Sequence, residues 1–256
     1  MISRKLNLSE LRSKLKRKEP VTGSWIQTGS AEVAEIIADA GYDWIMIDME
    51  HGSISLNNLP DLIRSILLHQ SIPLVRVIEG NPSNCKGALD AGAAGILIPD
   101  VRSAKQLKDV ISWCAWPPAG IRGVGFSRAN LYGKYFQQYK EEAQQPFIVA
   151  QIEHVDAINN LNEILHVPGL DAVFIGPYDL SASLDVTGLF NHKDYMNTIK
   201  NFEKILKKSK TAFGIHVVHP NEKMLREKIE SGYLFNAFGT DAMFLIESSH
   251  NPLKVQ

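Results

Sequence analysis

The sequence predicts a single α/β domain of the (β/α)₈ type, a TIM barrel that spans residues 1–256. The chain has 256 residues, and one such barrel usually needs about 250. Short apolar segments alternate with longer amphipathic ones, and the apolar segments are nearly continuous, as in parallel strands that are buried on both faces. No break in composition marks a linker, so eight βα units favour a closed barrel over an open, doubly wound sheet.

The predicted strands are eight short segments rich in β-branched and aromatic residues. They cover residues 21–27, 44–48, 73–77, 95–99, 147–153, 172–176, 212–218 and 234–239. Amphipathic patterns between them predict helices at residues 31–40, 58–69, 83–91, 104–115, 157–165, 195–208 and 221–231, with a short last helix at 241–248. Asn81-Pro82-Ser83 is a typical helix start, and Gly41, Gly92 and Gly232 are typical helix ends.

The segment from residue 116 to residue 146 does not fit this regular alternation. It is long and rich in Gly, Arg, Tyr and Gln. Connections of this length tend to be lids, binding loops or interface arms, and we therefore expect a lid or interface loop here. Its Gly123-x-Gly125 pair lacks the third glycine and the strand-to-helix setting of a dinucleotide site.

The composition argues against several classes of partner. Apolar residues make up 45% of the chain, charged residues 21%, and the formal net charge is −1. No basic stripe is present that would collect nucleic-acid phosphates or anionic lipids, and no apolar run reaches the ~18 residues of a membrane span. Residues 1–20 are too charged for a signal peptide. These features predict a cytoplasmic protein that acts on small molecules.

The two cysteines, Cys85 and Cys114, are too few for a disulfide framework or a cysteine-based zinc site. We interpret both as buried structural thiols.

Polar side chains gather at the predicted strand ends, which is where (β/α)₈ barrels carry their catalytic groups. The second strand ends in Asp48-Met49-Glu50-His51. A carboxylate beside a histidine fixes its tautomer, so the free ring nitrogen can take a proton. The alternative is that Asp48 caps the following turn while His51 is a solvated loop residue.

Two carboxylates, Glu153 and Asp179, follow adjacent strands. Oxygen ligands completed by waters suit a hard divalent ion such as Mg²⁺ or Mn²⁺, and a bidentate 2-oxo acid would complete the shell. Each carboxylate could instead pair with a cation or cap a helix. Their position on adjacent strands favours the metal interpretation.

Two further strand residues are candidates for contact with a substrate. Arg76 is suited to neutralise a carbonyl oxygen that becomes an oxyanion, and its alternative role is an ion pair with Glu50 or Glu79. Gln151 can donate a hydrogen bond to a substrate oxygen, or it is a polar residue of the rim.

The predicted strands contain no lysine. An imine-forming aldolase needs a lysine inside the barrel, so the sequence favours metal-assisted enolate chemistry. His216 and His219, on and after the seventh strand, could line the same face, but we do not include them among the site residues.

These motifs together resemble the HpcH/HpaI aldolases, the class II pyruvate aldolases. The resemblance runs from about Gly23 to about Leu245. It is carried by the segments 41–52, Val75-Arg76, Glu79-Gly80, 120–125, 151–153 and 174–184.

The resemblance implies a role for each matching residue. His51 would be the base with Asp48 as its acid partner, and Arg76 would stabilise the enolate. Glu153 and Asp179 would hold the divalent metal, which is Mg²⁺, Mn²⁺ or Co²⁺. Substrate contacts would come from Gln151, from the backbone near Gly176 and Asp179, and from Asp90 of a neighbouring subunit. A homo-oligomer follows, with a hexamer built as a trimer of dimers in the family.

The implied reaction is the cleavage or formation of 4-hydroxy-2-oxo acids from pyruvate and an aldehyde. Decarboxylation of oxaloacetate or an acyl-CoA lyase reaction would use the same site, and a non-catalytic barrel protein is the alternative of another class. The sequence departs from the family pattern in two places. Tyr178 stands where relatives have a small residue, so it would either narrow the pocket or point away from it, and we include it among the substrate contacts. The chain after Asp241 is short, which puts the family's exchange of the last helix in doubt.

Overall fold

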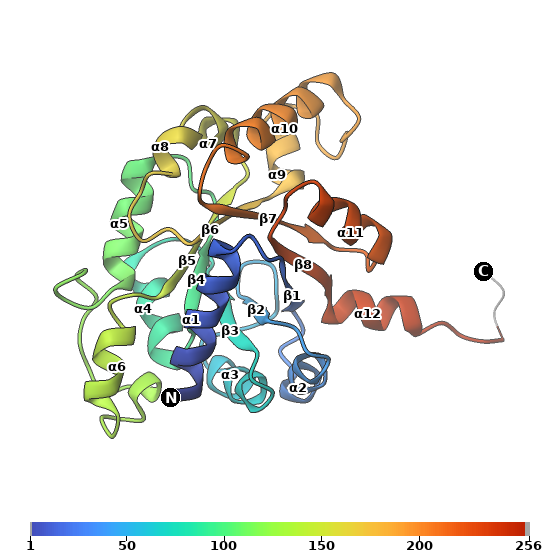
Figure 1. Ribbon diagram of the computed structural model, residues 1–256. Helices are drawn as coiled ribbons and strands as arrows, with labels where there is room; N and C mark the ends of the chain where they lie inside the picture. Colours follow the sequence, from blue (N-terminus) through green and yellow to red (C-terminus); the bar gives the residue numbers. More distant parts are fainter. Residues whose placement is uncertain (1, 254–256) are drawn as a thin grey trace.

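The computed structural model describes the backbone of residues 2–253 and the side chains of residues 7–253. Eight parallel strands form a closed barrel in the order β1 to β8, with β8 paired to β1 (Figure 1). The strands are β1 (Val21–Ile26), β2 (Trp44–Asp48), β3 (Ile72–Arg76), β4 (Gly95–Ile98), β5 (Phe147–Ile152), β6 (Ala172–Ile175), β7 (Ala212–Val217) and β8 (Phe235–Thr240). The predicted barrel is confirmed, and closure excludes the open doubly wound sheet.

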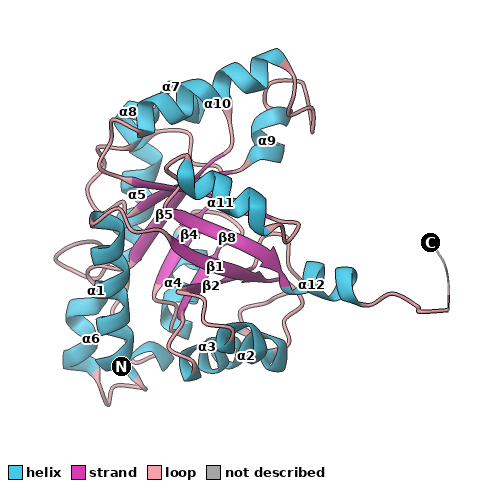
Figure 2. Ribbon diagram, turned by 45° about the vertical axis from the view of Figure 1, so that its right-hand side comes forward, coloured by secondary structure: helices cyan, strands magenta, loops and turns pink. Residues whose placement is uncertain are grey.

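Helices surround the barrel (Figure 2). They are α1 (Ile2–Lys16), α2 (Ala31–Asp39), α3 (Leu59–Leu68), α4 (Pro82–Ala91), α5 (Ala104–Cys114), α6 (Phe136–Glu142), α7 (Val155–Asn159), α8 (Leu161–Ile164), α9 (Pro177–Ala182), α10 (Lys193–Leu206), α11 (Glu222–Glu230) and α12 (Asp241–Ser248). The helix predicted at 157–165 is two short helices, α7 and α8. Helices α1 and α6 were not predicted from the sequence, and α9 was considered only through the possible capping role of Asp179. No helix within residues 2–253 combines the length and the apolar composition that crossing a membrane requires.

The barrel separates two apolar cores. One lies between the strands and the surrounding helices, and it contains Ile45, Val75 and Phe213. The other fills the barrel, where Trp44 and Phe235 stack at 4.3 Å between ring centroids. Gly23 leaves room for this stack, because a Cβ at that position would lie 2.1 Å from the Trp44 ring. Residue alternation along each strand therefore assigns one face to each core.

Helix α1 closes the end of the barrel at which the strands begin. Leu8, Leu11 and Leu15 are buried and belong to the interior core. Arg12 binds both oxygens of Asp171 at 2.7 and 2.9 Å. Residues 1–20 were judged too charged for a signal peptide, and no helix was predicted there. The leucines at spacings of three and four residues were the available signal.

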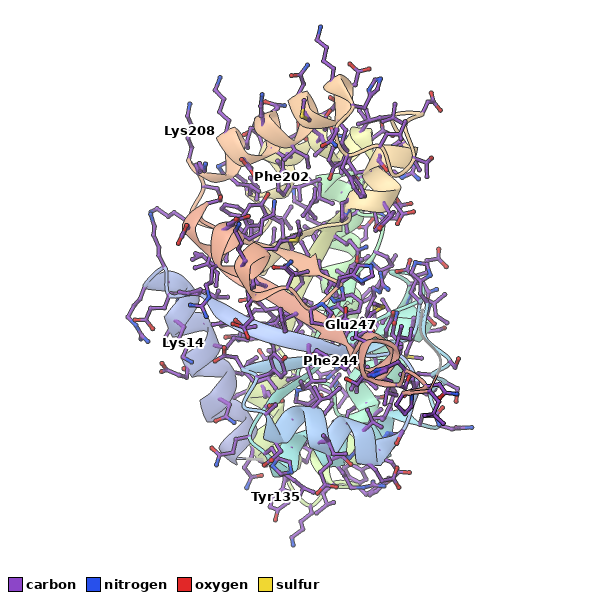
Figure 3. All side chains as sticks on the ribbon, turned by 90° about the vertical axis from the view of Figure 1, so that its right-hand side faces the viewer. Lys14, Tyr135, Phe202, Lys208, Phe244 and Glu247 are labelled. Carbon is purple, nitrogen blue, oxygen red and sulfur yellow. The ribbon has the colours of Figure 1, made fainter. Side chains whose placement is uncertain are left out.

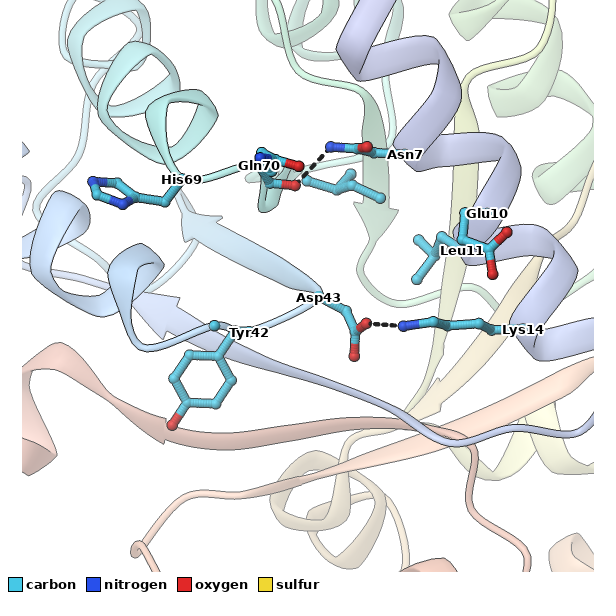
Figure 4. Close-up of a pocket in the computed structure, with 10 residues that line it drawn as sticks. Asn7, Glu10, Leu11, Lys14, Tyr42, Asp43, His69 and Gln70 are labelled. Atoms are coloured by element: carbon cyan, nitrogen blue, oxygen red, sulfur yellow. Dashed lines mark hydrogen bonds and ion pairs between the residues drawn. The ribbon is translucent and has the colours of Figure 1, made fainter.

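Polar contacts fasten α1 to the loops that precede β2 and β3 (Figure 4). Lys14 Nζ lies 2.7 Å from Asp43 Oδ1, and Asn7 Nδ2 donates to the carbonyl of Gln70 at 2.7 Å. A cavity of about 250 Å³ remains between these residues. It lies at the opposite end of the barrel from the polar strand ends.

The segment from residue 116 to residue 146 has a structure of its own. It contains a 3₁₀ turn (Arg128–Asn130) and α6, and Trp116, Ala129, Tyr139 and Ala143 form a small separate core. The guanidinium of Arg122 is buried there and donates to the Tyr139 hydroxyl at 2.9 Å. The segment is thus not an unstructured loop, and its role as a lid or interface arm stays a prediction.

The short last helix is confirmed as α12. It projects from the barrel in Figure 1, and Figure 3 views it along its axis, with Phe244 and Glu247 labelled. Leu245 and Ile246 are 53% and 65% exposed. This helix therefore carries apolar side chains outside either core.

We expect Leu11→Ala to lower the free energy of unfolding by about 2–5 kcal/mol, because it leaves a cavity where α1 seals the barrel. Urea denaturation followed by circular dichroism measures the change. The control is Ser9→Ala, on the exposed face of the same helix, for which the midpoint should stay the same. An unchanged midpoint for Leu11→Ala would show that α1 does not support the barrel.

Candidate active site

Polar side chains form the last inward-facing layer at the carboxyl end of the barrel. The layer includes Trp25, Asp48, Arg76, Gln151 and His216. Residue alternation explains it, because the residues two positions earlier on β2, β3 and β5, which are Met46, Leu74 and Val149, belong to the interior core. The strand register also places Asp48 directly opposite Arg76, because the two residues are partners in the pairing of β2 with β3. The barrel thus brings Asp48, Arg76 and Gln151, which were predicted at separate strand ends, into one layer.

Asp48 and Arg76 form a buried, bidentate ion pair. Arg76 Nε and Nη2 donate to the two carboxylate oxygens of Asp48 at 2.9 and 2.7 Å. Burial alone would raise the pKa of Asp48, but the hydrogen bonds and charge of Arg76 outweigh it, and the pKa is lowered. The Arg76 guanidinium also lies 4.5 Å from the ring centroid of Trp25. Both charges are therefore compensated inside the protein.

The expected contact between Asp48 and the ring of His51 is absent from the described side chains. Asp48 Oδ1 accepts the backbone N–H groups of Glu50 and His51 at 3.1 and 3.2 Å, and Oδ2 accepts from Gln27 Nε2 at 3.0 Å. These bonds and those of Arg76 occupy the carboxylate. Asp48 thus fixes the turn that carries His51, which is the alternative considered from the sequence, and does not orient the imidazole.

Glu50 is the carboxylate that approaches His51. Its Oε2 lies 3.9 Å from His51 Nε2 and 2.9 Å from Arg76 Nη1. Burial raises the pKa of Glu50 against the opposing charge of Arg76, and nearby Asp48, Asp179 and Asp100 raise it further. The His51 side chain is 61% exposed, so its ring is accessible from the barrel mouth. Of the two ion-pair partners considered for Arg76, Glu50 is the one observed.

Glu153, Gln151 and Gly176 are packed against each other. The Gln151 amide nitrogen donates to Glu153 Oε2, and Glu153 Oε1 accepts the backbone N–H of Asp100 at 2.6 Å. Gln151 Oε1 is buried without a partner among the described residues. A Cβ at Gly176 would lie 2.6 Å from Glu153 Oε2. Gly176 therefore matters by leaving space for the Glu153 carboxylate.

Asp179 lies in the first turn of α9, exposed at the end of the barrel. Its charge, with that of Glu50, adds to the burial that raises the pKa of Glu153 to about 7. Tyr178 is 58% exposed, and its ring meets that of Phe190 edge-on at 5.1 Å. Tyr178 thus packs against the connection between α9 and α10. Its predicted contact with a substrate stays a prediction.

Asp90 lies on the outer helix α4, in a hollow of about 590 Å³ that Leu56 and Lys86 also line. Burial raises the pKa of Asp90. None of the ion pairs or hydrogen bonds found among residues 7–253 joins it to Glu153 or Asp179. The expected role of Asp90 in the site of a neighbouring subunit stays a prediction.

The carboxylates Glu153 and Asp179 fit a hard divalent cation in charge and in ligand type. Glu50 and Asp100 add negative charge nearby. Among the described side chains, no group of three or more His, Cys, Asp or Glu is arranged to hold a metal ion. Two carboxylates leave most coordination positions to water or to an oxygen-rich substrate.

Four residues of this region were not among the sequence-based candidates. Trp25 and Gln27 contact Arg76 and Asp48, while Asp100 binds Glu153 through its backbone and Arg102 through its side chain at 2.7 Å. His216 stacks on Trp25 at 4.9 Å between ring centroids. The available signal was their position at strand ends. His219 instead lies 3.8 Å from Glu247 and is exposed.

None of the eight strands contains a lysine. The barrel interior therefore offers no strand lysine for an imine, as expected from the sequence.

Comparison with known proteins gives consistent results. The model of the HpcH/HpaI aldolase/citrate lyase family matches residues 22–248. A 2-keto-3-deoxy-L-rhamnonate aldolase of Klebsiella pneumoniae is 36% identical over 236 residues, covering 91% of this chain and 88% of the relative. A 4-hydroxy-2-oxo-heptane-1,7-dioate aldolase of Escherichia coli is 33% identical over 243 residues, covering 94% and 92%.

Solved structures agree with these sequence matches. The crystal structure of an HpcH/HpaI aldolase/citrate lyase family protein from Burkholderia cenocepacia superposes with a TM-score of 0.87 at 31% identity. The match covers 93% of this chain and 95% of that chain.

We expect Glu153→Gln to stabilise the metal-free protein at pH 8. The folded-state pKa of about 7 lies above the ordinary value of 4.5, so the folded state binds the proton more tightly and stability falls as pH rises between these values. Above pH 7 the ionised carboxylate lowers the free energy of unfolding by up to about 3 kcal/mol. Urea unfolding in EDTA from pH 5 to pH 8.5 measures the gain, which should shrink towards pH 5.

The matched control is Glu163→Gln, an exposed glutamate on α8, for which we expect no pH-dependent difference. If Glu153→Gln lowered the free energy of unfolding equally at pH 5 and at pH 8, the ionised carboxylate would not be destabilising, and the prediction would be wrong.

Proposed function

The chain belongs to the HpcH/HpaI aldolase/citrate lyase family of carbon–carbon lyases, and we propose that it cleaves and forms 4-hydroxy-2-oxo acids, with pyruvate and an aldehyde as products of cleavage. The observation that carries this proposal is the carboxyl end of the barrel. A buried Arg76–Asp48 pair, the accessible His51 and the carboxylates Glu153 and Asp179 lie together there. The two aldolases named above act on 2-oxo acids of this kind.

Glu153 and Asp179 are the residues that would hold a divalent cation. Such an ion, when bound, supplies a Lewis acid that polarises the 2-oxo group of the substrate. The hydrogen bond from the Asp100 backbone to Glu153 Oε1 and the tight packing of Gly176 hold the Glu153 carboxylate in one position. Both contacts support a preformed site.

His51 is the proposed base. In cleavage its neutral ring takes the proton of the substrate 4-hydroxyl, the C3–C4 bond breaks, and the aldehyde leaves. The bond electrons pass to the C2 oxygen, which becomes an enolate. The same histidine then returns the proton to C3 and gives pyruvate, and synthesis is the reverse. The Glu50 carboxylate lies 3.9 Å from Nε2, so it would stand next to the imidazolium that forms during the step.

Arg76 supplies the positive charge near the enolate oxygen. Asp48 and Glu50 hold its guanidinium through three contacts of 2.7–2.9 Å. A rigid, buried cation is worth more to a developing anion than a mobile one in water. Asp48 thus acts by positioning Arg76 and the turn of His51.

The first test is exchange of the pyruvate methyl protons in D₂O, followed by NMR. We expect exchange with Mg²⁺, Mn²⁺ or Co²⁺, and a rate at least about 100-fold lower in His51→Ala, since general bases contribute about 10²–10⁴. The control is His166→Ala, an exposed histidine after α8, which should exchange like the parent. Full exchange in His51→Ala would exclude it as the base.

The same assay tests the metal. EDTA should abolish exchange, and Glu153→Gln or Asp179→Asn should require much more metal for the half-maximal rate. Asp109→Asn, on the outer helix α5, is the control. Exchange that persists in EDTA would exclude metal assistance.

We also infer that the chain forms a homo-oligomer, with a hexamer as the expected assembly. Large apolar side chains are exposed on the segment 116–146 and on α12, among them Ile121, Phe126, Tyr132 and Ile246. Exposed apolar groups of this kind are typical of interfaces.

Light scattering after size-exclusion chromatography should give a mass several times the 28.5 kDa of one chain. Phe126→Ser should lower this mass, whereas Lys208→Ser, on the outer surface after α10, should leave it unchanged. A monomeric parent protein would contradict the inference.

A further inference from the structure

His216 lies inside the barrel mouth, although no role has been given to it above. Ala212 belongs to the interior core and Phe213 to the outer one, so alternation along β7 directs His216 inward. Its ring stacks on Trp25 at 4.9 Å with an interplanar angle of 21°. Trp25 in turn contacts Arg76. The imidazole is therefore part of the layer that carries the proposed catalytic groups.

The hydrogen bonding of His216 defines which ring nitrogen is free. Nε2 lies 2.9 Å from the backbone carbonyl oxygen of Gly239. A carbonyl only accepts, so Nε2 carries the hydrogen, and Nδ1 of the neutral ring is an acceptor. Burial lowers the pKa of His216 to about 4, with a further contribution from Arg76. The ring is thus neutral at pH 7.

His216 Nδ1 is open to a ligand. It has no hydrogen-bond partner among the described side chains and backbone. It is also not one of the fully enclosed polar atoms that lack a partner. The atom is therefore not fully enclosed by protein, unlike Gln151 Oε1, and alternation along β7 directs the ring that carries it into the barrel.

We propose that His216 selects the aldehyde: its Nδ1 accepts a hydrogen bond from a hydroxyl group of the substrate, so that the chain prefers hydroxyaldehydes. This inference rests on the proposed aldolase function and specifies the class of its second substrate. The 2-oxo acid end is already provided for by Arg76 and by the carboxylates of β5 and α9.

The charges in the mouth favour a hydroxyl over a second carboxylate. A lone pair on Nδ1 repels a carboxylate oxygen, and Glu50, Asp100 and Asp179 add negative charge. The cations found nearby are already paired, Arg76 with Asp48 and Glu50, and Arg102 with Asp100. Among the described residues of the mouth, an aldehyde that carries a carboxylate would therefore meet no arginine without a carboxylate partner, whereas a hydroxyl group donates directly to Nδ1.

The test compares aldol addition of pyruvate to lactaldehyde, propanal and succinic semialdehyde, with kcat/KM measured for each. These aldehydes carry a hydroxyl, no polar group and a carboxylate. The parent should prefer lactaldehyde. In His216→Leu the lactaldehyde-to-propanal ratio should fall about 10-fold, since one neutral hydrogen bond is lost. His216→Asn, which keeps an acceptor near the position of Nδ1, should restore much of the ratio. His219→Leu is the control and should leave the ratio unchanged.

An unchanged ratio in His216→Leu, a parent that prefers succinic semialdehyde, or a His216→Asn ratio as low as that of His216→Leu would each overturn the inference. Exchange of pyruvate protons by the parent is measured first. If exchange occurs, these outcomes count against His216 alone. If no exchange occurs with any metal, the proposed function fails, and the inference fails with it.

Discussion

The buried ion pair between Asp48 and Arg76 is the interaction on which the carboxyl end of the barrel depends. It connects β2 to β3 and holds a guanidinium that would otherwise be costly to bury. Trp25 of β1 covers that guanidinium, and Gln27, just after β1, completes the shell of Asp48. The same carboxylate binds the backbone of the turn that carries His51. One charge pair thus sets the positions of groups from three neighbouring strands.

Much of the fold could be predicted because the barrel strands are apolar on both faces. Each bound of the eight strands lies within one residue of its predicted position. Helix α1 was missed because polar and charged residues together dominate its composition, while Leu8, Leu11 and Leu15 form a narrow buried stripe among its described side chains. Helix α6 was missed for a similar reason, since the packing of Tyr139 against Trp116 depends on contacts distant in sequence.

The candidate site was predictable in position but not in its pairings. Strand ends identify Asp48, Arg76, Gln151 and Glu153, because parallel strands end on one side of a barrel. Because Asp48 is close to His51 in sequence, we expected it to contact the imidazole. The cross-strand register instead places Asp48 beside Arg76, with which it forms an ion pair. The environment of His216 was equally hidden, since its partners Trp25 and Gly239 lie on β1 and β8. Pairings of this kind arise from closure of the barrel.

The seal that α1 forms has a consequence for the order of events in catalysis. With Leu8, Leu11 and Leu15 filling one end of the barrel, ligands can enter and leave only through the other. A 2-oxo acid held at Glu153 and Arg76 and an aldehyde at His216 would both pass through this mouth, because these side chains belong to the same end of the barrel. The two products of the proposed cleavage would then leave one after the other through the same passage.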